Sequence, residues 1–489
     1  MKNYDPYKRT ILFFASVINI ILMAGIFAYA WYNHYSDTMY VYRFYRRGHY
    51  VIIALYAVIL FFFSNMYGGL KIGQLRRIEV MLSQYLSLLL SNIVMYVIIS
   101  LLAFRFVSPF VLVLMMLAEM VLSTVWNALT IHIYNRIFQP WKILLIYEGE
   151  HSAMNLVNKV ETRRDKYAIY DAISVDAGMD AIADRIQYFQ AVIIGDISAV
   201  KRNDLLKYCY ANQIRAYVVP KLSDIILMGG DRIHIFDTPF VLSKGYTLSF
   251  DQRLIKRILD LLLAVFATIL TSWIMLFTAI AIKLTDGGPI LYRQIRCTEK
   301  NRQFTIYKFR SMVVDAEKDG VARLAEKEDE RITAVGRFIR ATRIDELPQL
   351  FNIIRGDMSF VGPRPERPEI IEQYMSDMPE FQFRTRVKAG LTGYAQIYGK
   401  YNTTPYDKLK LDLFYIENYT LWIDIKIILM TLKTVLKKEA TDGIEQGQIT
   451  AMKENSAAQE ISVEALVKEI VKEQGERVES PLSSEKIAK

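Results

Sequence analysis

The chain has 489 residues, which is enough for two or three domains. Hydrophobic residues make up 52% of it, an excess that indicates membrane segments, and its two cysteines exclude a disulfide framework. The net charge of +9 fits basic loops on the cytoplasmic side of a membrane, whereas nucleic-acid binding is not expected because no basic and aromatic module of the usual kinds is present.

Four apolar stretches fill the first quarter of the chain, at residues 10–32, 50–67, 85–104 and 109–129. Each is close to the roughly 20 residues that a helix needs to cross a bilayer, so we expect a four-helix transmembrane domain over residues 1–139. The distribution of Lys and Arg among the loops favours a cytoplasmic N-terminus. Glu119 lies inside the fourth stretch, where it is either a functional acid or a partner in a helix–helix hydrogen bond.

Residues 140–250 alternate short apolar runs with polar segments of helical length, a pattern typical of a parallel α/β sheet. The turn after the first run keeps one glycine, Gly149, of the three in a dinucleotide-binding fingerprint. The same turn places Glu148 and Glu150 where a pyrophosphate would lie. We therefore expect a degenerate Rossmann-like domain with a structural or regulatory role that does not bind NAD.

A fifth apolar stretch, residues 261–282, has basic residues on both flanks, and these prefer the same cytoplasmic face. We therefore expect residues 251–285 to form a re-entrant or interfacial membrane helix, followed by an α-rich interfacial catalytic domain over residues 286–440. Residues 441–489 are polar and charged, with one short amphipathic pattern. They are expected to be a flexible tail with a transient helix rather than a specific binding arm.

The predicted catalytic domain contains two adjacent acids, Asp345 and Glu346. On a helix they point about 100° apart, which suits two separate tasks. An aspartate can attack phosphorus and a glutamate can hold Mg²⁺. Alone, such a pair is an ordinary solvated charged surface, so its interpretation depends on the cations that surround it.

The cations come from two other segments. Arg364 stands between Pro363 and Pro365, which restrict the backbone of a permanently charged, planar phosphate-binding group. Lys308 and Arg310 lie on one side of an extended run, where they are suited to flank a pyrophosphate. Farther along the chain, Gly390 to Gly393 form a turn with paired glycines that suits close approach of the backbone to a ligand.

Several sequence blocks occur in one order: Asp286-Gly287-Gly288-Pro289, Tyr307 to Met312, Arg343 to Leu350, Gly356 to Glu366, Lys388 to Gly393, and the series Asp412, Tyr415, Asn418 and Asp424. In this order they resemble the bacterial sugar transferase family, the polyprenyl-phosphate sugar-1-phosphate transferases. The whole chain resembles the large members that start capsule, exopolysaccharide or O-antigen synthesis. The resemblance implies transfer of a sugar-1-phosphate from a UDP-sugar to undecaprenyl phosphate, with release of UMP and a phospho-sugar intermediate on Asp345.

The resemblance also implies a cofactor and residue roles. Mg²⁺ would be bound by Glu346. The phosphates would be steadied by Lys308, Arg310, Arg343 and Arg364. Substrate contacts would come from Pro363, Pro365, Gly393, Asp412, Tyr415 and Asp424. The implied location is the bacterial cytoplasmic membrane, with several membrane passes, contact with membrane lipids, and the catalytic domain facing the cytoplasm.

One departure from the family concerns the fifth apolar stretch. The family usually carries Ser-Pro midway along it, and this chain has Ser272-Trp273. Without that proline, we expect the hydroxyls of Thr271 and Ser272 to bond back to the preceding turn and help to bend the helix.

Two other functions are alternatives to sugar-1-phosphate transfer. A membrane-bound NAD-dependent nucleotide-sugar dehydratase or epimerase is disfavoured by the glycines missing around Gly149. A non-catalytic scaffold that regulates polysaccharide assembly is disfavoured by the presence of Asp345, Glu346 and Arg364 together. No sequence pattern identifies the sugar or the oligomeric state, although a Rossmann-like domain without a ligand suits the pairing of two copies, as in a homo-oligomer.

Overall fold

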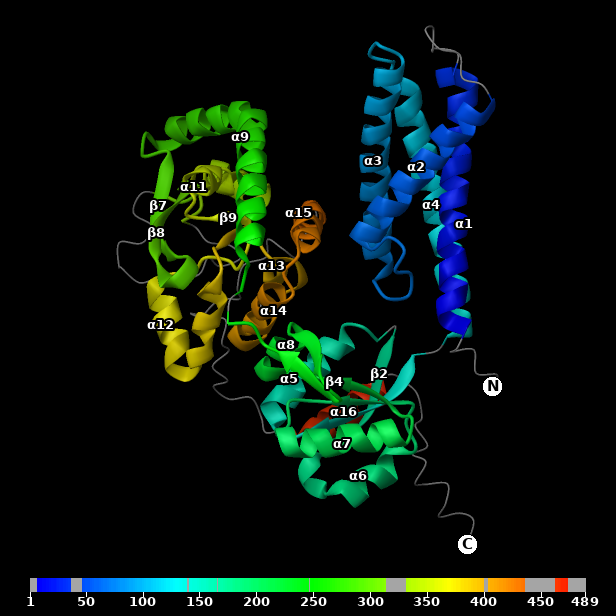
Figure 1. The fold of residues 1–489 in the computed structure, drawn as a ribbon, viewed down its shortest axis with the longest axis vertical. Coiled ribbons are helices and arrows are strands. Elements are labelled where there is room, and N and C mark those ends of the chain that lie inside the picture. Colours follow the sequence, from blue (N-terminus) through cyan, green and yellow to red (C-terminus); the bar gives the residue numbers. More distant parts are fainter. Residues whose placement is uncertain are drawn as a thin grey trace. The chain divides into compact units, whose positions relative to one another are not determined.

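The computed structural model describes residues 7–36, 46–138, 140–164, 166–245, 247–313, 331–399, 403–435 and 462–473. The chain divides into two compact units (Figure 1). The first comprises residues 1–221 with 455–489, and the second comprises residues 222–454.

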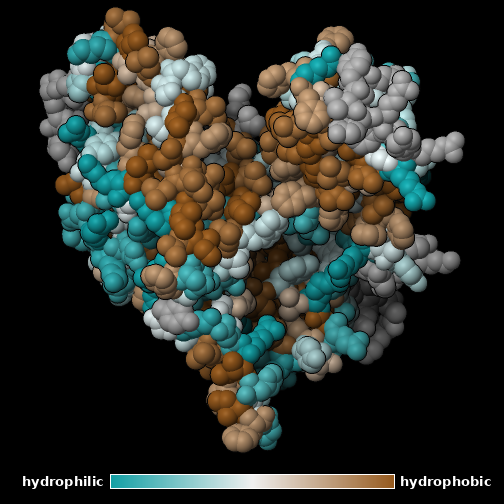
Figure 2. All heavy atoms as spheres, turned by 45° about the horizontal axis from the view of Figure 1, so that its top comes forward, coloured by the Kyte–Doolittle hydropathy of each residue, from teal (hydrophilic) through white to brown (hydrophobic). Residues whose placement is uncertain are grey.

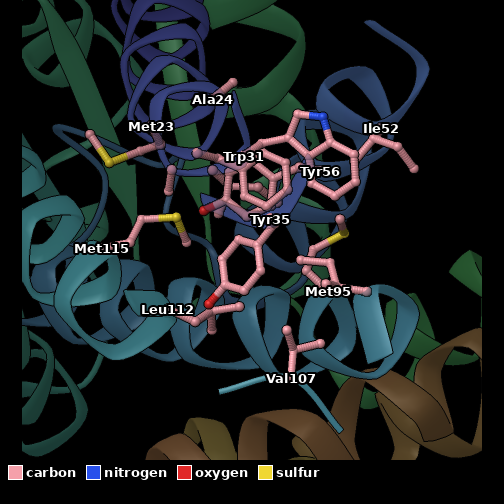
Figure 3. Packing of buried hydrophobic residues seen from close by; sticks show 14 of the residues in the cluster. Met23, Ala24, Trp31, Tyr35, Ile52, Tyr56, Met95, Val107, Leu112 and Met115 are labelled. Carbon is pink, nitrogen blue, oxygen red and sulfur yellow. The ribbon is translucent and has the colours of Figure 1, made fainter. Parts of the chain in front are cut away.

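The first unit begins with four long helices: α1 (Lys8–Ala30), which continues in a π-helical turn over Trp31–Tyr35, α2 (Arg46–Tyr67), α3 (Arg77–Leu102) and α4 (Phe110–Ile137). By length and composition all four are able to cross a membrane, in agreement with the four predicted stretches. The aromatic side chains of Phe27, Trp31, Tyr35 and Tyr56 pack with aliphatic residues at the centre of the bundle (Figure 3). Hydrophobic residues also cover broad parts of the molecular surface (Figure 2).

Glu119 lies inside this bundle and joins three of its helices. Its carboxylate accepts hydrogen bonds from the Tyr56 hydroxyl at 2.5 Å and from the Asn92 side-chain amide at 2.8 Å. Both oxygens are therefore used in contacts between α4, α2 and α3. The helix–helix hydrogen bond accounts for this buried acid.

The first unit continues with a parallel sheet in the order β2-β1-β3-β4, as the alternating pattern predicted. Its elements are β1 (Trp141–Tyr147), α5 (Glu150–Glu161), β2 (Tyr167–Ser174), α6 (Met179–Ile186), β3 (Ala191–Ile194), α7 (Ala199–Ala211) and β4 (Arg215–Val218). Alternate residues of β1 enter different clusters: Ile143 and Leu145 pack with α5, and Leu144 and Ile146 pack with α6 and α7.

The turn after β1 uses its acids within the chain. The Glu148 carboxylate accepts hydrogen bonds from the Ser198 backbone N–H at 2.6 Å and from Lys201 Nζ at 3.1 Å. These donors at the start of α7 are the kind that bind phosphate in nucleotide-binding domains. Here they are engaged by the protein's own acid, and the expected absence of a bound dinucleotide stays a prediction.

Part of the predicted tail covers the sheet. Helix α16 (Val463–Glu473) places Val463, Val467 and Ile470 in the same cluster as Ile143 and Leu145. The Val463 N–H donates to Glu150 Oε2 at 2.8 Å. Over residues 462–473 the structure therefore differs from the expected flexible tail. The reason is that β1 has apolar side chains on both faces, which a local reading of the tail cannot reveal. Residues 441–461 and 474–489 lie outside the described part of the chain.

The second unit is rich in helices, with three separate pairs of strands. Its elements are α8 (Leu222–Met228), the β5 (Asp231–Ile235) and β6 (Thr238–Leu242) hairpin, α9 (Phe250–Asp286), the antiparallel pair β7 (Leu291–Cys297) and β8 (Gln303–Phe309), α10 (Ala334–Ala341), α11 (Gln349–Arg355), β9 (Ser359–Val361), α12 (Pro368–Asp377), a 3-10 segment (Pro379–Arg386), β10 (Gly390–Thr392) parallel to β9, α13 (Tyr394–Tyr398), α14 (Pro405–Glu417) and α15 (Leu421–Val435).

Helix α9 is bent into two arms, as Figure 1 shows in green. Ala264 packs with residues of α11, and Ile282 packs with Phe309 and Ile339, so both arms lie against one small domain. The predicted hydroxyl bonds are present: Thr271 Oγ1 donates to Ala267 O at 2.7 Å, and Ser272 Oγ donates to Ile269 O at 2.8 Å. By length and composition α9 is also able to cross a membrane. Its re-entrant insertion stays a prediction.

Candidate active site

The two acids of the candidate site lie on a 3-10 turn, Ile344–Glu346, between α10 and α11. Pro348 directly precedes α11, a position where its missing N–H costs the helix no hydrogen bond. Arg343, just before the turn, has a φ of 58°, a left-handed conformation that is uncommon for a side chain of this size. Backbone strain of this kind persists where the surrounding structure enforces it, and it concentrates at functional sites.

Three cations converge on the Glu346 carboxylate. Its Oε1 lies 3.0 Å from Lys308 Nζ, 3.5 Å from Arg364 Nη2 and 4.0 Å from Arg343 Nη1. Burial raises the pKa of Glu346, but the charges of Lys308, Arg364 and Arg343 outweigh burial and hold it well below its usual range. Glu346 is therefore ionised at any physiological pH.

The Asp345 carboxylate has a different environment. The side chain is buried, with 9% of the residue exposed, and its Oδ1 has no hydrogen-bond partner in the described part of the chain. Burial raises the pKa of Asp345 and the neighbouring Glu346 raises it further, against the charges of Lys308, Arg343 and Arg340. A buried carboxylate oxygen without a partner is costly to keep, and its perturbed pKa marks it as a candidate for chemistry.

The donor set fits the predicted metal in part. Among the described residues no group of three or more His, Cys, Asp or Glu side chains is placed to hold a metal ion. Mg²⁺ is nevertheless commonly held by one or two carboxylates, with phosphate and water oxygens completing its shell. Asp345 and Glu346 supply two adjacent carboxylates, one with an unengaged oxygen. They fit that mode of binding and do not fit an all-protein site.

Of the predicted phosphate-binding residues, Lys308, Arg343 and Arg364 meet at Glu346. The fourth, Arg310, has Gly288 as a close neighbour. The Arg310 side chain is buried beneath Gly288, where an added Cβ would lie 2.5 Å from Arg310 Nη1. Gly288 is thus explained by the space that the guanidinium needs, and Gly287 by its left-handed φ of 70° at the end of α9. Phosphate binding by Arg310 stays a prediction.

Gly393 lies where two chain segments cross. A Cβ added to it would lie 2.2 Å from the carbonyl oxygen of Gly362, which precedes Pro363. The absence of a side chain therefore lets the β9 and β10 segments pass each other closely. Ligand contacts at Pro363, Pro365 and Gly393 stay predictions.

Asp412, Tyr415 and Asp424 are all buried. Asp424 is held by Lys256 Nζ at 2.6 Å and by the Tyr415 hydroxyl at 2.8 Å, and Asp412 lies 2.9 Å from Arg384 Nη2. These partners give the three residues structural contacts inside the domain. Their expected contact with substrate stays a prediction that their burial does not favour.

Sequence reasoning missed Arg340, whose charge lowers the pKa of Asp345. Its spacing of three residues from Arg343 near the end of α10 was the available signal. It also missed Arg296 and Arg384, which contact the segment around Arg364 from distant parts of the chain. No local pattern marks those two residues.

Comparison with known proteins assigns the chain to a family. The model of the bacterial sugar transferase family matches residues 251–438. The undecaprenyl-phosphate galactose phosphotransferase of Salmonella typhimurium is 32% identical over 356 residues, which cover 65% of this chain and 73% of that protein. The chain belongs to the bacterial sugar transferase family.

Two other relatives in the family share shorter regions. The UDP-N-acetylgalactosamine-undecaprenyl-phosphate N-acetylgalactosaminephosphotransferase of Aeromonas hydrophila is 44% identical over 185 residues, 37% of this chain and 44% of that protein. The UDP-glucose:undecaprenyl-phosphate glucose-1-phosphate transferase of Escherichia coli is 39% identical over 205 residues, 41% of this chain and 42% of that protein. This chain therefore aligns with less than half the length of each of these two sugar transferases.

Proposed function

We propose that the chain transfers a sugar-1-phosphate from a UDP-sugar to undecaprenyl phosphate, with release of UMP, as the first membrane step of surface polysaccharide synthesis. The observation that carries this proposal is the unpartnered, buried Oδ1 of Asp345 beside a cluster of cations. The names of the relatives, which are undecaprenyl-phosphate sugar phosphotransferases, support the same reaction class.

The charge balance of the site suits a diphosphate. Lys308, Arg343 and Arg364 lie within 4.0 Å of Glu346, and Arg340 acts on Asp345. These four positive charges exceed the two carboxylates. A negative nucleophile is able to approach a negative phosphorus only where such charges offset the repulsion, and phosphoryl transfer depends mainly on this positioning and stabilisation.

The proposed chemistry has two balanced steps. Asp345 Oδ1 attacks the phosphorus attached to the sugar, an O–P bond forms, and the bond to UMP breaks as UMP leaves. A phosphate oxygen of undecaprenyl phosphate then attacks the same phosphorus, and the bond to Asp345 breaks to restore the carboxylate. Bound Mg²⁺ would offset phosphate charge, with Glu346 and Asp345 as its protein ligands.

Helix α9 supplies the proposed membrane contact. Only 11% of the residues in its most apolar stretch are buried by the protein, compared with 28% to 39% in the four helices of the bundle. Arg257, by contrast, donates to the carbonyls of Ile353 and Ile354, and Asp260 accepts from Ser359. The start of α9 is thus fixed to the catalytic fold, and the apolar part that follows is suited to enter the cytoplasmic leaflet.

The test is UMP release by the full-length protein in lipid nanodiscs that contain undecaprenyl phosphate and Mg²⁺. A panel of UDP-sugars is supplied one at a time. Release of UMP with one sugar, together with a radiolabelled lipid product, is the expected result. Absence of both with every sugar of the panel would refute the proposed function.

A further inference from the structure

The backbone on either side of Arg364 is held in an unusual way. Its four consecutive carbonyl oxygens each accept a hydrogen bond: Pro363 O from Gly390 N at 2.9 Å, Arg364 O from Arg384 Nη2 at 3.0 Å, Pro365 O from Arg296 Nη1 at 3.1 Å, and Glu366 O from Cys297 N at 3.0 Å. Two of the donors are backbone groups and two are arginine side chains.

The sequence explains why side chains are needed. Pro363 and Pro365 have no backbone N–H, so this segment has few donors with which to join a sheet or helix. Its carbonyls are therefore the main groups by which it can be fixed. A guanidinium is suited to this task because its five N–H groups reach several oxygens in one plane.

Arg384 joins the segment to the buried Asp412 and to Glu366, whose side chain is 11% exposed. Only 2% of Arg384 is exposed, and besides Arg364 O it contacts Asp412 Oδ2 at 2.9 Å and Glu366 Oε1 at 3.4 Å. Glu366 in turn pairs with Lys408 and lies 3.8 Å from Arg296 Nη1. Burial raises the pKa of Glu366, but Lys408, Arg384 and Arg296 lower it to about 2, so this centre stays charged.

We propose that Arg384, oriented by Asp412 and Glu366, and Arg296, which donates to Gln294 Oε1 at 2.6 and 3.0 Å, are positioning residues that fix the guanidinium of Arg364 beside Glu346. This inference rests on the proposed function, in which Arg364 binds the phosphates of the donor. Among the described side chains neither Arg384 nor Arg296 forms an ion pair with Asp345 or Glu346. Their effect on substrate therefore passes through the backbone of Arg364.

The experiment measures the affinity of UDP, in the presence of Mg²⁺, by isothermal titration calorimetry on the full-length protein in nanodiscs. Four proteins are compared: the unaltered chain, Arg384→Lys, Arg364→Ala and the double variant. Lysine keeps the charge that Asp412 and Glu366 require, but its single nitrogen replaces two: Nη1, which contacts Glu366, and Nη2, which contacts Arg364 O and Asp412. Because a misplacement of about 1 Å can cost on the order of 100-fold, we expect Arg384→Lys to weaken UDP binding by about tenfold or more.

The double variant separates positioning from general stability. If Arg384 acts through Arg364, the double variant should bind UDP within about twofold of Arg364→Ala alone, because coupled residues do not contribute additively. The matched control is Arg386→Lys, two residues along the same 3-10 segment. Arg386 is 47% exposed and pairs with Glu417 at 3.7 Å, so its replacement should leave the affinity unchanged.

Each outcome has one meaning. Losses that add in the double variant would overturn the positioning role while leaving the proposed function intact. Failure of the unaltered protein to bind UDP would overturn both. Thermal melting is recorded for every variant, and if Arg384→Lys does not fold, Arg296→Lys carries the same cycle because Arg296 is less buried.

Discussion

Two regions of this molecule place acids in a turn that leads to a helix, and they treat them in opposite ways. In the Rossmann-like domain Glu148 is engaged by Ser198 and Lys201, and Glu150 accepts from Tyr147 and Val463. In the candidate active site Glu346 is similarly engaged, but the Oδ1 of Asp345 has no partner among the described residues. The acid that the protein leaves unsatisfied, and not the acid pair as such, therefore distinguishes the turn to which we assign the chemistry.

The largest expected effect is at Asp345. Asp345→Asn should lower UMP release by on the order of 10³-fold or more and abolish trapping of a radiolabelled phospho-sugar on the protein, because the nucleophile is lost. Glu148→Gln, the matching change in the other turn, should alter the rate less than twofold. Comparable losses of UMP release in the two variants would contradict the assigned difference between the two turns.

The next effect concerns Glu346, which holds the three cations together. Glu346→Gln should lower the rate by about 10-fold to 100-fold and raise the Mg²⁺ concentration needed for half-maximal rate, since a ligand and a charge partner are lost together. Initial rates over a Mg²⁺ titration measure both quantities. An unchanged titration would exclude Glu346 as a metal ligand.

The same two acids should affect stability in opposite directions. The pKa of Asp345 is raised in the folded protein, so the folded state binds its proton more tightly and stability falls as pH rises above the ordinary aspartate value. The pKa of Glu346 is lowered, so its contribution is present at neutral pH and is lost as pH falls through the lowered value. At pH 7 Asp345→Asn should therefore raise the melting temperature and Glu346→Gln should lower it. Melting temperatures that move in the same direction would contradict this assignment.

The pH dependence of the rate should distinguish Asp345 from Glu346. Asp345 must be ionised to attack, and Glu346 stays ionised over the working range, so the acidic limb of the profile should report Asp345. The rate should fall on acidification at a pH above that of an ordinary aspartate. A single-turnover measurement of UMP release in overlapping buffers checks this, and a limb at the ordinary aspartate value would count against a buried nucleophile.

The smallest expected effect on activity comes from the sheet of the Rossmann-like domain. Val467 is 1% exposed against that sheet, and Val467→Ala should cost about 1–3 kcal/mol of stability through the cavity it leaves. The rate per folded molecule should stay within twofold, because this domain supplies none of the proposed catalytic residues. Differential scanning calorimetry and UMP release measure the two effects separately.

The sequence anticipated those parts of the structure that depend on local periodicity and on short motifs. The long apolar helices and the parallel sheet belong to this group. The structure also brings Lys308, Arg343 and Arg364 to Glu346, while their binding of phosphate stays a prediction. A motif fixes which residues are near one another in the chain and constrains their spacing. A motif does not fix the direction in which each side chain points. The position of the Arg310 guanidinium next to Gly288 was therefore not predicted from the sequence.

Contacts between distant segments were beyond the reach of the sequence. Arg384 meets Arg364 across 20 positions, and Lys256 meets Asp424 across 168. The ion pairs of Asp412 and Asp424 depend on which helices pack together, and a single chain carries no record of that packing. Asp412 and Asp424 therefore have ion-pair partners inside the domain that the sequence did not indicate, and their contact with substrate stays a prediction.

The position of α16 has a consequence for how this protein is made. Its apolar face adds to a sheet whose strands lie some 250 residues or more nearer the N-terminus, since Val463 belongs to the same buried cluster as Tyr147 and Ala191. During translation those strands emerge from the ribosome well before the helix that covers them. A nascent chain that stops short of residue 463 leaves this apolar surface of the sheet exposed to chaperones and proteases. The core of the domain can therefore close only after α16 has been synthesised.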